Sequence, residues 1–512
     1  MTDNLRYPDL EKRFLLVLDQ GTTSTRALLY DQRANPVEQT QIELPQVFPE
    51  PGWVEHDAET IWQHSLKCLQ GTLKKSGISA NEVAGLGITN QRETVVLWDK
   101  ETGIPIHNAL VWQDRRTARF CEQLRNQDLE SKVTQKTGLL LDPYFSATKL
   151  AWLLDKVPNA RQLAKEGRLA AGTIDSYLIA RLTGLAVHAT DATNASRTLL
   201  FDIHQLKWDP DLLEMFNIPN YVLPEVRDSI GSFGAVEPLF LGAEIPILAV
   251  AGDQQAAAFG QGCWEPGLMK STYGTGCFTL LHCGTQPPTS KNRLLSTIAL
   301  MENGECTYAL EGSIFNAGTA IQWLRDELGF LTSAEQSEKL ALAANPKSQV
   351  LFVPAFTGMG APHWNAHARG TIFGLTRDTG RADIVRAALE AVAWQTVDLM
   401  EATAEDLGNL PKLLRVDGGM AKNNWFLQFL ADVLQLPVQR PKDTETTAFG
   451  ACLLAGKAAG FWSTSEEIAS CWQEDRTFQP SMEPKELRRR RSQWALAVQS
   501  VLKIADNLGH MA

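Results

Sequence analysis

Residues 15–30 of the chain read LLVLDQGTTSTRALLY. Two apolar runs flank a turn that is rich in Gly and Thr, which is typical of two buried strands joined by a tight hairpin. Residues 268–281 read LMKSTYGTGCFTLL, again a strand, a Gly/Thr turn and an apolar strand. The hairpins lie about half of the chain apart, so we predict two related domains that each lend a loop to one cleft. Chance similarity of short hairpins is the alternative.

The rest of the chain alternates short apolar runs with amphipathic segments of helix length. Runs that resemble buried strands are residues 14–18, 83–88, 95–98, 245–251 and 413–416, and helical spacing appears in residues 383–407 and 424–436. This alternation indicates an α/β fold. We place the domain boundary near residue 260, which gives domains of residues 1–259 and 260–512.

Composition excludes several classes of protein. The 512 residues are 44% hydrophobic and 21% charged, which is ordinary for a folded globular chain. A formal net charge of −11 provides no basic field for nucleic acid. No apolar stretch reaches the roughly 18 residues that a membrane span needs, and the eight cysteines form no Cys-x-x-Cys pair. We therefore expect a cytoplasmic protein with reduced thiols.

Both Gly/Thr turns suit phosphate, because Gly lets backbone N–H groups approach and Thr adds a hydroxyl donor. Asp19 precedes the first turn, where a carboxylate could hold a hydrated Mg²⁺ that bridges phosphates. A tight turn without a ligand is the alternative for each. A third glycine site, Asp417-Gly418-Gly419, joins a strand to a helix and favours a nucleotide, or else close packing of the two elements. Neither a P-loop nor a Gly-x-Gly-x-x-Gly after a strand is present, so an ATP site must be of another type.

Asp253 follows the apolar run 245–251 and Gly252. Ligands of open α/β sheets gather at the carboxyl ends of strands, so this carboxylate lies where a general base is needed. An ordinary helix N-cap is the alternative.

Arg92 and Glu93 lie between two predicted strands, where they could bind a polyol or form a surface ion pair. Trp112 and Tyr144 could supply flat walls for a carbon skeleton, although core packing is the commoner role of an aromatic side chain.

Five segments together resemble the FGGY family of carbohydrate kinases, and the resemblance runs from about residue 14 to 505. They are residues 18–26, 90–94, 252–255, 273–278 and 417–419, and two longer signatures at residues 144–156 and 370–390 also match. The resemblance implies an actin-like pair of ribonuclease-H-like domains of the hexokinase type that close over a cleft.

Within this family the chain resembles the members that move the γ-phosphoryl group of MgATP to the 3-hydroxyl of glycerol, the first step of glycerol catabolism. The resemblance implies Asp253 as the base and Asp19 as the Mg²⁺ ligand. Glycerol would meet Arg92, Glu93, Trp112, Tyr144, Asp253, Gln254 and Phe278. The nucleotide and its phosphates would meet Thr22, Thr23, Ser24, Arg26, Thr275, Gly318, Gln322, Gly419 and Asn423.

Two other functions stay open. One is a kinase of the same family for another small polyol or ketose, which would differ only in the pocket. The other is an actin-like ATPase without a metabolite substrate. Family members are often dimers or tetramers, and the resemblance implies a homodimer or homotetramer. Bacterial members that fructose 1,6-bisphosphate inhibits carry a Gly and Arg loop before the strand that leads to the catalytic Asp. This chain has Glu244 there, so we expect weak or absent inhibition of that type.

Overall fold

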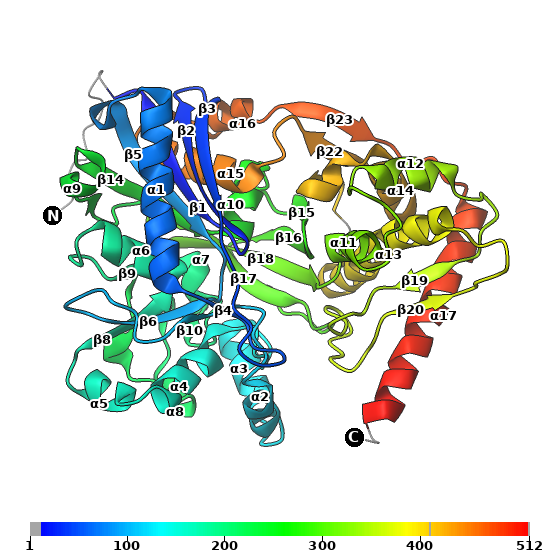
Figure 1. The fold of residues 1–512 in the computed structure, drawn as a ribbon, viewed down its shortest axis with the longest axis horizontal. Helices are drawn as coiled ribbons and strands as arrows, with labels where there is room; N and C mark the ends of the chain where they lie inside the picture. The colour runs from blue at the N-terminus through cyan, green and yellow to red at the C-terminus, as the bar shows by residue number, and fades with distance from the viewer. Residues whose placement is uncertain (1–11, 409–410, 510–512) are drawn as a thin grey trace.

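The computed structural model describes residues 12–408 and 411–509, and it contains two large β-sheets that lie side by side (Figure 1). The first sheet has the strand order β13-β14-β5-β1-β2-β3. Its strands are β1 (Phe14–Gln20), β2 (Ser24–Asp31), β3 (Pro36–Glu43), β5 (Val83–Asn90), β13 (Ala235–Val236) and β14 (Ile245–Gly252).

Strands β1, β2 and β3 form an antiparallel meander, and β5 and β14 run parallel to β1. In the register of the sheet, Asn90 at the end of β5 lies beside both Gln20 of β1 and Gly252 of β14. The carboxyl ends of three strands therefore meet at one edge of this sheet.

The second sheet has the order β17-β18-β16-β15-β21-β22-β23. Its strands are β15 (Met269–Tyr273), β16 (Cys277–Gly284), β17 (Leu295–Glu302), β18 (Glu305–Ile314), β21 (Leu414–Asp417), β22 (Val438–Pro441) and β23 (Glu474–Phe478). Here β15, β16 and β18 are antiparallel, whereas β21 and β22 run parallel to β15. The arrangement of the first sheet is thus repeated, and the two predicted hairpins are β1–β2 and β15–β16. The predicted pair of ribonuclease-H-like folds is confirmed.

Alternation along β1 explains how the first sheet is covered on both faces. Leu16 and Leu18 pack with residues of α1 (Ala58–Ser76) and α6 (Ile174–Leu182). Leu15 and Val17 pack instead with α15 (Thr446–Ala458), which comes from far along the chain. In a β-strand, successive side chains point to opposite faces of the sheet, so neighbouring residues of β1 pack against different helices.

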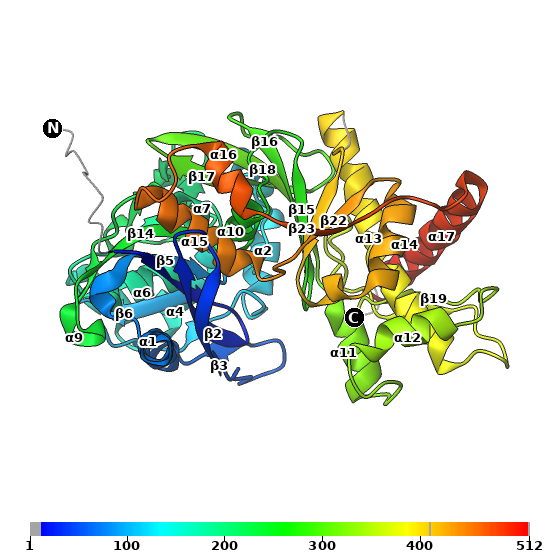
Figure 2. The same ribbon diagram turned by 90° about the horizontal axis from the view of Figure 1, so that it is seen from above.

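Helix α10 (Asp253–Gly260) lies between α15 and β15, as Figure 2 shows. Its crossing with α15 is unusually close, because a Cβ atom on Gly450 would lie 1.8 Å from the carbonyl oxygen of Ala256. Any larger residue at position 450 would force these two helices apart, so the glycine allows α10 and α15 to cross closely.

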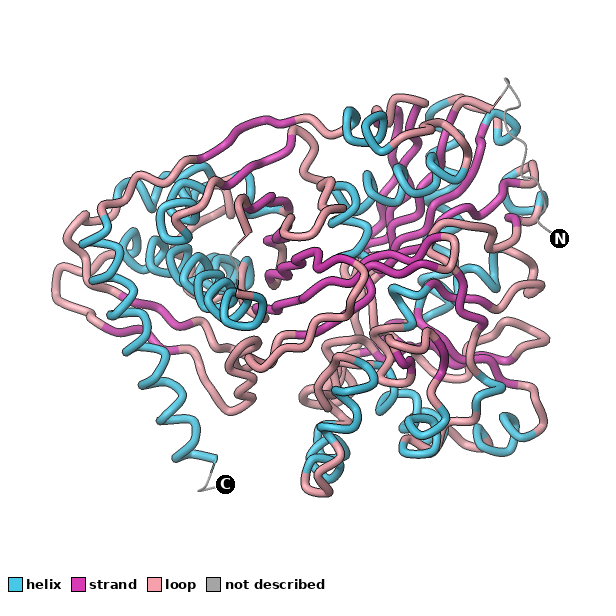
Figure 3. The backbone as a smooth tube through the Cα atoms, turned by 180° about the vertical axis from the view of Figure 1, so that it is seen from behind, coloured by secondary structure: helices cyan, strands magenta, loops and turns pink. Residues whose placement is uncertain are grey.

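The second sheet is covered by a helical layer that shares one hydrophobic core with it. This layer contains α11 (Gly318–Asp326), α12 (Gln336–Ala343), α13 (Arg381–Leu407), α14 (Asn424–Leu434) and α17 (Pro484–Gly509). Helix α17 runs beside these helices and extends beyond them at its C-terminal end (Figure 3). None of the helices in the described ranges is long and apolar enough to cross a bilayer.

A smaller sheet and its helices are inserted within the first half, and this insertion carries Trp112 and Tyr144. Its sheet has the order β4-β7-β6-β8, with strands β4 (Glu55–His56), β6 (Val95–Asp99), β7 (Ala109–Leu110) and β8 (Leu169–Thr173). The surrounding helices are α2 (Ala118–Arg125), α3 (Glu130–Thr137), α4 (Ser146–Lys156), α5 (Ala160–Lys165) and α8 (Pro210–Met215). The smaller remaining elements are β9 (Ala189–Asp191), α7 (Ala192–Ala195), β10 (Phe201–Asp202), β11 (Lys207–Trp208), β12 (Glu225–Arg227), α9 (Pro238–Leu241), β19 (Leu351–Val353), β20 (Thr371–Phe373) and α16 (Ser465–Cys471).

Candidate active site

A cavity of about 410 Å³, here called the first cavity, opens where the carboxyl ends of β1, β5 and β14 face the second sheet. The turns of both hairpins line it, as the sequence predicts for two domains that share a cleft. Predicted residues in its wall are Thr22, Thr23, Arg92, Glu93, Trp112, Tyr144, Asp253, Gln254, Thr275, Phe278 and Gln322. Polar and aromatic side chains from both halves therefore converge on one space.

Asp253 is the first residue of α10, and the N-cap position belongs to Gly252. Its Oδ1 accepts a hydrogen bond from the backbone N–H of Gln254 at 2.8 Å and lies 3.2 Å from Arg92 Nε. Burial raises the pKa of Asp253 to about 6, and the neighbouring Arg92 opposes this shift. The side chain keeps 29% of its surface exposed to the cavity. The carboxylate is thus available to a ligand, which an ordinary capping role would not require.

Arg92 and Glu93 are buried, with 3% and 2% of their surface exposed, so the surface ion pair considered above is wrong. They do not pair closely with each other, since Arg92 Nε and Glu93 Oε1 are 4.0 Å apart. Glu93 has a φ of 61°, in the left-handed region, and its carbonyl accepts a hydrogen bond from Ser146 Oγ at 3.1 Å. The backbone turn therefore points these two adjacent charged side chains in different directions, so that each can reach a different partner.

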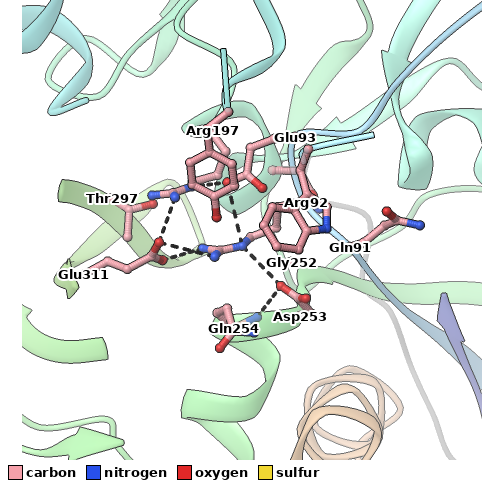
Figure 4. Close-up of polar contacts among 12 residues, drawn as sticks. Gln91, Arg92, Glu93, Arg197, Gly252, Asp253, Gln254, Thr297 and Glu311 are labelled. Atoms are coloured by element: carbon pink, nitrogen blue, oxygen red, sulfur yellow. Dashed lines mark hydrogen bonds and ion pairs between the residues drawn. The ribbon is translucent and has the colours of Figure 1, made fainter. Parts of the chain in front are cut away.

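Each of these side chains has a fixed partner elsewhere in the chain (Figure 4). Arg92 Nη1 donates to Glu311 Oε2 at 2.6 Å, and Arg197 Nε donates to Glu93 Oε1 at 2.7 Å. Arg197 Nη2 also donates to Glu311 Oε1 at 2.8 Å. The result is one continuous buried network that runs from Asp253 through Arg92, Glu311 and Arg197 to Glu93.

The sequence analysis missed Glu311 and Arg197. Glu311 stands in the middle of β18, where residues 308–310 and 312 are apolar or small, and an acid inside such a run is a detectable signal. Arg197 follows α7 in a segment of small polar residues, and nothing in that pattern marks it. Both are fully buried, with 0% of their surface exposed.

An aromatic wall closes another side of the first cavity. The ring of Trp112 lies 5.6 Å from that of Tyr144 and 6.0 Å from that of Phe278, each in an edge-to-face arrangement. Trp112 Nε1 donates a hydrogen bond to Thr22 Oγ1 at 2.9 Å. The wall is therefore joined directly to the turn of the first hairpin, and its residues face a cavity as well as the core.

Three of the predicted residues do not line the first cavity, namely Asp19, Ser24 and Arg26. They are also absent from the wall of the adjoining cavity around Gly318 and Asn423. Asp19 is 3% exposed at the end of β1, and its Oδ2 accepts from Arg26 Nη2 at 2.5 Å. Burial raises the pKa of Asp19, against the opposing charge of Arg26. Arg26 also pairs with Glu445. The Oδ1 atom of Asp19 forms no hydrogen bond within the described residues.

A second cavity of about 380 Å³ continues from the first and shares Gly274, Thr275 and Gln322 with it. Its wall also contains Gly318, Gly419 and Asn423. A Cβ on Gly318 would lie 2.5 Å from the carbonyl oxygen of Gly274, so glycine lets α11 begin directly against the second hairpin. At Gly419 no atom lies within 4 Å of such a Cβ, which leaves open space beside the backbone.

This arrangement suits transfer of a group between two ligands in adjoining cavities. The first cavity offers a carboxylate with a raised pKa, donors and acceptors side by side, and aromatic walls, which suit a small polar molecule. Both Gly/Thr turns line the first cavity, and the second turn lies where the two cavities adjoin. Backbone N–H groups at such turns bind phosphate. Within residues 12–408 and 411–509 no group of three His, Cys, Asp or Glu side chains could hold a metal ion without help from a ligand.

Comparison with known proteins agrees with this geometry. Residues 14–260 match the model of the N-terminal domain of the FGGY family of carbohydrate kinases, and residues 269–459 match that of its C-terminal domain. The chain is 54% identical to a glycerol kinase of Chelativorans sp. over 96% of its own length and 98% of the relative's. It is 55% identical to a glycerol kinase of Alcanivorax borkumensis, over 95% and 98% of the two chains. A crystal structure of Plasmodium falciparum glycerol kinase with ADP superposes with a TM-score of 0.88 at 36% identity, covering 96% and 98% of the two chains.

Proposed function

Because the chain belongs to the FGGY family of carbohydrate kinases, we propose that it transfers the γ-phosphoryl group of ATP to glycerol and forms sn-glycerol 3-phosphate. Relatives that share more than half of their residues with it over nearly the whole chain are named glycerol kinases. The observation that carries the proposal is the position of Asp253, Arg92 and Glu93 in one cavity that adjoins a second at Thr275.

Asp253 acts as the general base. Phosphoryl transfer passes through a loose transition state, so a base needs only to accept the proton of the hydroxyl late in the reaction. A carboxylate with a pKa of about 6 is ionised at neutral pH and accepts that proton more readily than an ordinary aspartate does. Arg92 Nε, at 3.2 Å, fixes the orientation of the carboxylate.

Glycerol is recognised by the polar end of the first cavity. Glu93 supplies acceptor oxygens and Arg92 supplies N–H donors, and each is held by a buried ion pair before the substrate arrives. A preorganised pair of this kind loses little entropy when it binds adjacent hydroxyls. Trp112, Tyr144 and Phe278 pack on the carbon atoms and limit the length of the substrate.

The nucleotide occupies the second cavity, next to Gly318, Gln322, Gly419 and Asn423, with its phosphates toward Thr275 and the turn at Thr22 and Thr23. Ser24 and Arg26 lie in β2, directly after this turn, and support it without lining either cavity. Arg26 holds one oxygen of Asp19 and leaves the other uncommitted within the described residues.

The free oxygen of Asp19 fits a Mg²⁺ that is bound mainly by phosphates and water, because such ions often take only one or two protein carboxylates. When bound, Mg²⁺ would neutralise charge on the phosphates. Asp19, at the end of β1, would be the residue of this chain that holds the ion.

We also propose a domain boundary near residue 260, at the end of α10, with residues 1–11 of the first domain outside the described residues. Helix α15 then returns from the second domain to cover the first sheet. A homodimer or homotetramer and a cytoplasmic location are further parts of the proposal.

A substrate panel tests the function. The purified protein is given MgATP with glycerol, dihydroxyacetone, erythritol or xylulose, and ADP release and the phosphorylated product are measured. We expect glycerol to have the highest kcat/KM, because the aromatic wall restricts the cavity. A preference for xylulose would contradict the choice of glycerol. Slow ADP release that no polyol stimulates would favour the actin-like ATPase.

A further inference from the structure

Lys270 is a fully buried cation beside the first cavity, and the mechanism above gives it no role. It lies in β15, two residues before Thr272, and none of its surface is exposed. In the sheet it is paired with Leu280 of β16 and Arg415 of β21. A charged side chain in the central strand of a sheet is costly unless something compensates for the charge.

The ammonium group of Lys270 contacts the wall of the first cavity from behind. Nζ donates to Gln254 Oε1, to Thr272 Oγ1 at 2.9 Å and to the carbonyl oxygen of Phe278 at 3.4 Å. All three of these residues line the cavity. Lys270 therefore ties α10, which carries the base, to both strands of the second hairpin.

None of these three acceptors carries a charge, and Lys270 forms no ion pair with any described carboxylate. Burial lowers the pKa of Lys270, and this shift is opposed by the negative charge of Asp417, supported by the positive charge of Arg92, and opposed again by Asp253 and Glu311. Burying an ammonium group without a direct counter-ion usually destabilises a protein more than an apolar residue of equal size would. A functional reason for keeping the charge is therefore required.

The charges around the site indicate that reason. Arg92 and Arg197 are matched by Glu93 and Glu311 in direct ion pairs, and Asp253 lies 3.2 Å from Arg92 Nε. Among these described charges, Lys270 is left without an ion-pair partner. During transfer the O–H proton of the polyol passes to Asp253 and the new O–P bond forms as the bond to ADP breaks. Asp253 then becomes neutral, and the positive charge of Lys270 remains behind the cavity wall, where its field opposes the negative charge on the phosphoryl oxygens.

On the basis of the proposed function, we propose that Lys270 is a positioning residue that holds the Gln254 side chain toward the polyol and compensates for the charge of the transferring phosphoryl group. Lys270 does not touch the substrates. It acts on them through its electrostatic field and through its hydrogen bond to Gln254 in the cavity wall. Preorganised positive groups near a developing negative charge stabilise a transition state more than a ground state.

The test compares Lys270→Met, Lys270→Gln and Lys270→Arg with the wild-type protein. Each variant is assayed for kcat and for the KM of glycerol. Binding of MgADP alone is compared with binding of MgADP plus aluminium fluoride and glycerol, a mimic of the transferring group. Thermal unfolding of each variant reports on its folding.

We expect Lys270→Met and Lys270→Gln to lower kcat about 100-fold and to weaken the aluminium fluoride complex by a similar factor, with the affinity for MgADP alone unchanged. Lys270→Arg should recover part of the affinity for the mimic. If Lys270→Met does not fold, the Gln and Arg variants make the same comparison. Equal losses for MgADP with and without aluminium fluoride, or a kcat within threefold of the wild type in both neutral variants, would overturn the proposal.

Lys149→Met is a matched control, because Lys149 is also fully buried and its Nζ also binds only neutral acceptors, the carbonyls of residues 143–145. It supports the loop that carries Tyr144, so its loss should raise the KM of glycerol without a selective loss of the mimic. Failure of the wild-type protein to phosphorylate glycerol would reject the proposed function itself. The Lys270 comparison can then be repeated with whichever polyol is active.

Discussion

Glu311 Oε2 accepts a hydrogen bond from Arg92 Nη1 at 2.6 Å, although 219 residues separate them. Glu311 is in β18 of the second sheet, and Arg92 follows β5 of the first. Both side chains are nearly inaccessible to solvent. The orientation of Arg92 in the polyol cavity therefore depends on a strand of the second half. Binding of glycerol and the relative position of the two halves are physically connected through this contact.

Replacement of Glu311 by Gln should destabilise the protein by about 3 kcal/mol, because it leaves the charges of Arg92 and Arg197 buried with too few counter-ions. Urea denaturation measures this change. Glu305→Gln, at the exposed end of the same strand, is the control and should leave the midpoint unchanged. Equal stability of Glu311→Gln and the wild type would show that the network contributes little.

Glu93→Ala should mainly raise the KM of glycerol, by roughly 10-fold to 100-fold, since a hydrogen bond to a charged group contributes about 1.5–3 kcal/mol. Steady-state kinetics with varied glycerol at saturating MgATP measures the effect. An unchanged KM would reassign the Glu93–Arg197 pair to a purely structural role.

Trp112→Phe should weaken use of ATP while keeping the aromatic wall. The substitution removes the hydrogen bond from Nε1 to Thr22 Oγ1 at 2.9 Å, so the phosphate turn loses one support. A neutral hydrogen bond contributes about 1 kcal/mol, so we expect an increase of about fivefold in the KM of ATP. The matching variant Thr22→Val removes the same bond from the other side. A larger effect on glycerol than on ATP would contradict this assignment.

The pH dependence of kcat/KM for glycerol should have an acidic limb near pH 6. Burial raises the pKa of Asp253 from 3.8 to about 6, so the base is protonated and inactive below that pH and ionised above it. Glu93 also raises this pKa, and Glu93→Gln should therefore move the limb to lower pH. A limb near pH 4 in the wild-type protein would show that Asp253 is solvated like an ordinary aspartate.

Much of the fold could be predicted from local sequence. Alternating apolar residues in β1 and the Gly/Thr turns at Thr22 and Thr275 are local patterns, and they gave two repeated hairpins facing one cleft. The packing of α15 on the first sheet could not be predicted, because no pattern in residues 446–458 identifies a partner more than 400 residues away.

The same limit applies to the site. Residues at the ends of predicted strands, such as Asp253, could be proposed because parallel strands end at one edge. Glu311 and Lys270 lie inside strands, where a charged residue indicates a special environment but not its partner. Which charges meet depends on how the two halves pack, and only the structure contains that information.

The most direct test of the account is the turnover of Asp253→Asn with saturating glycerol and MgATP, measured together with its affinity for MgADP. The substitution keeps the shape of the side chain and an oxygen that can accept from the N–H of Gln254. The account predicts that kcat falls between about 100-fold and 10,000-fold while the affinity for MgADP stays the same. Turnover close to that of the wild type would contradict it.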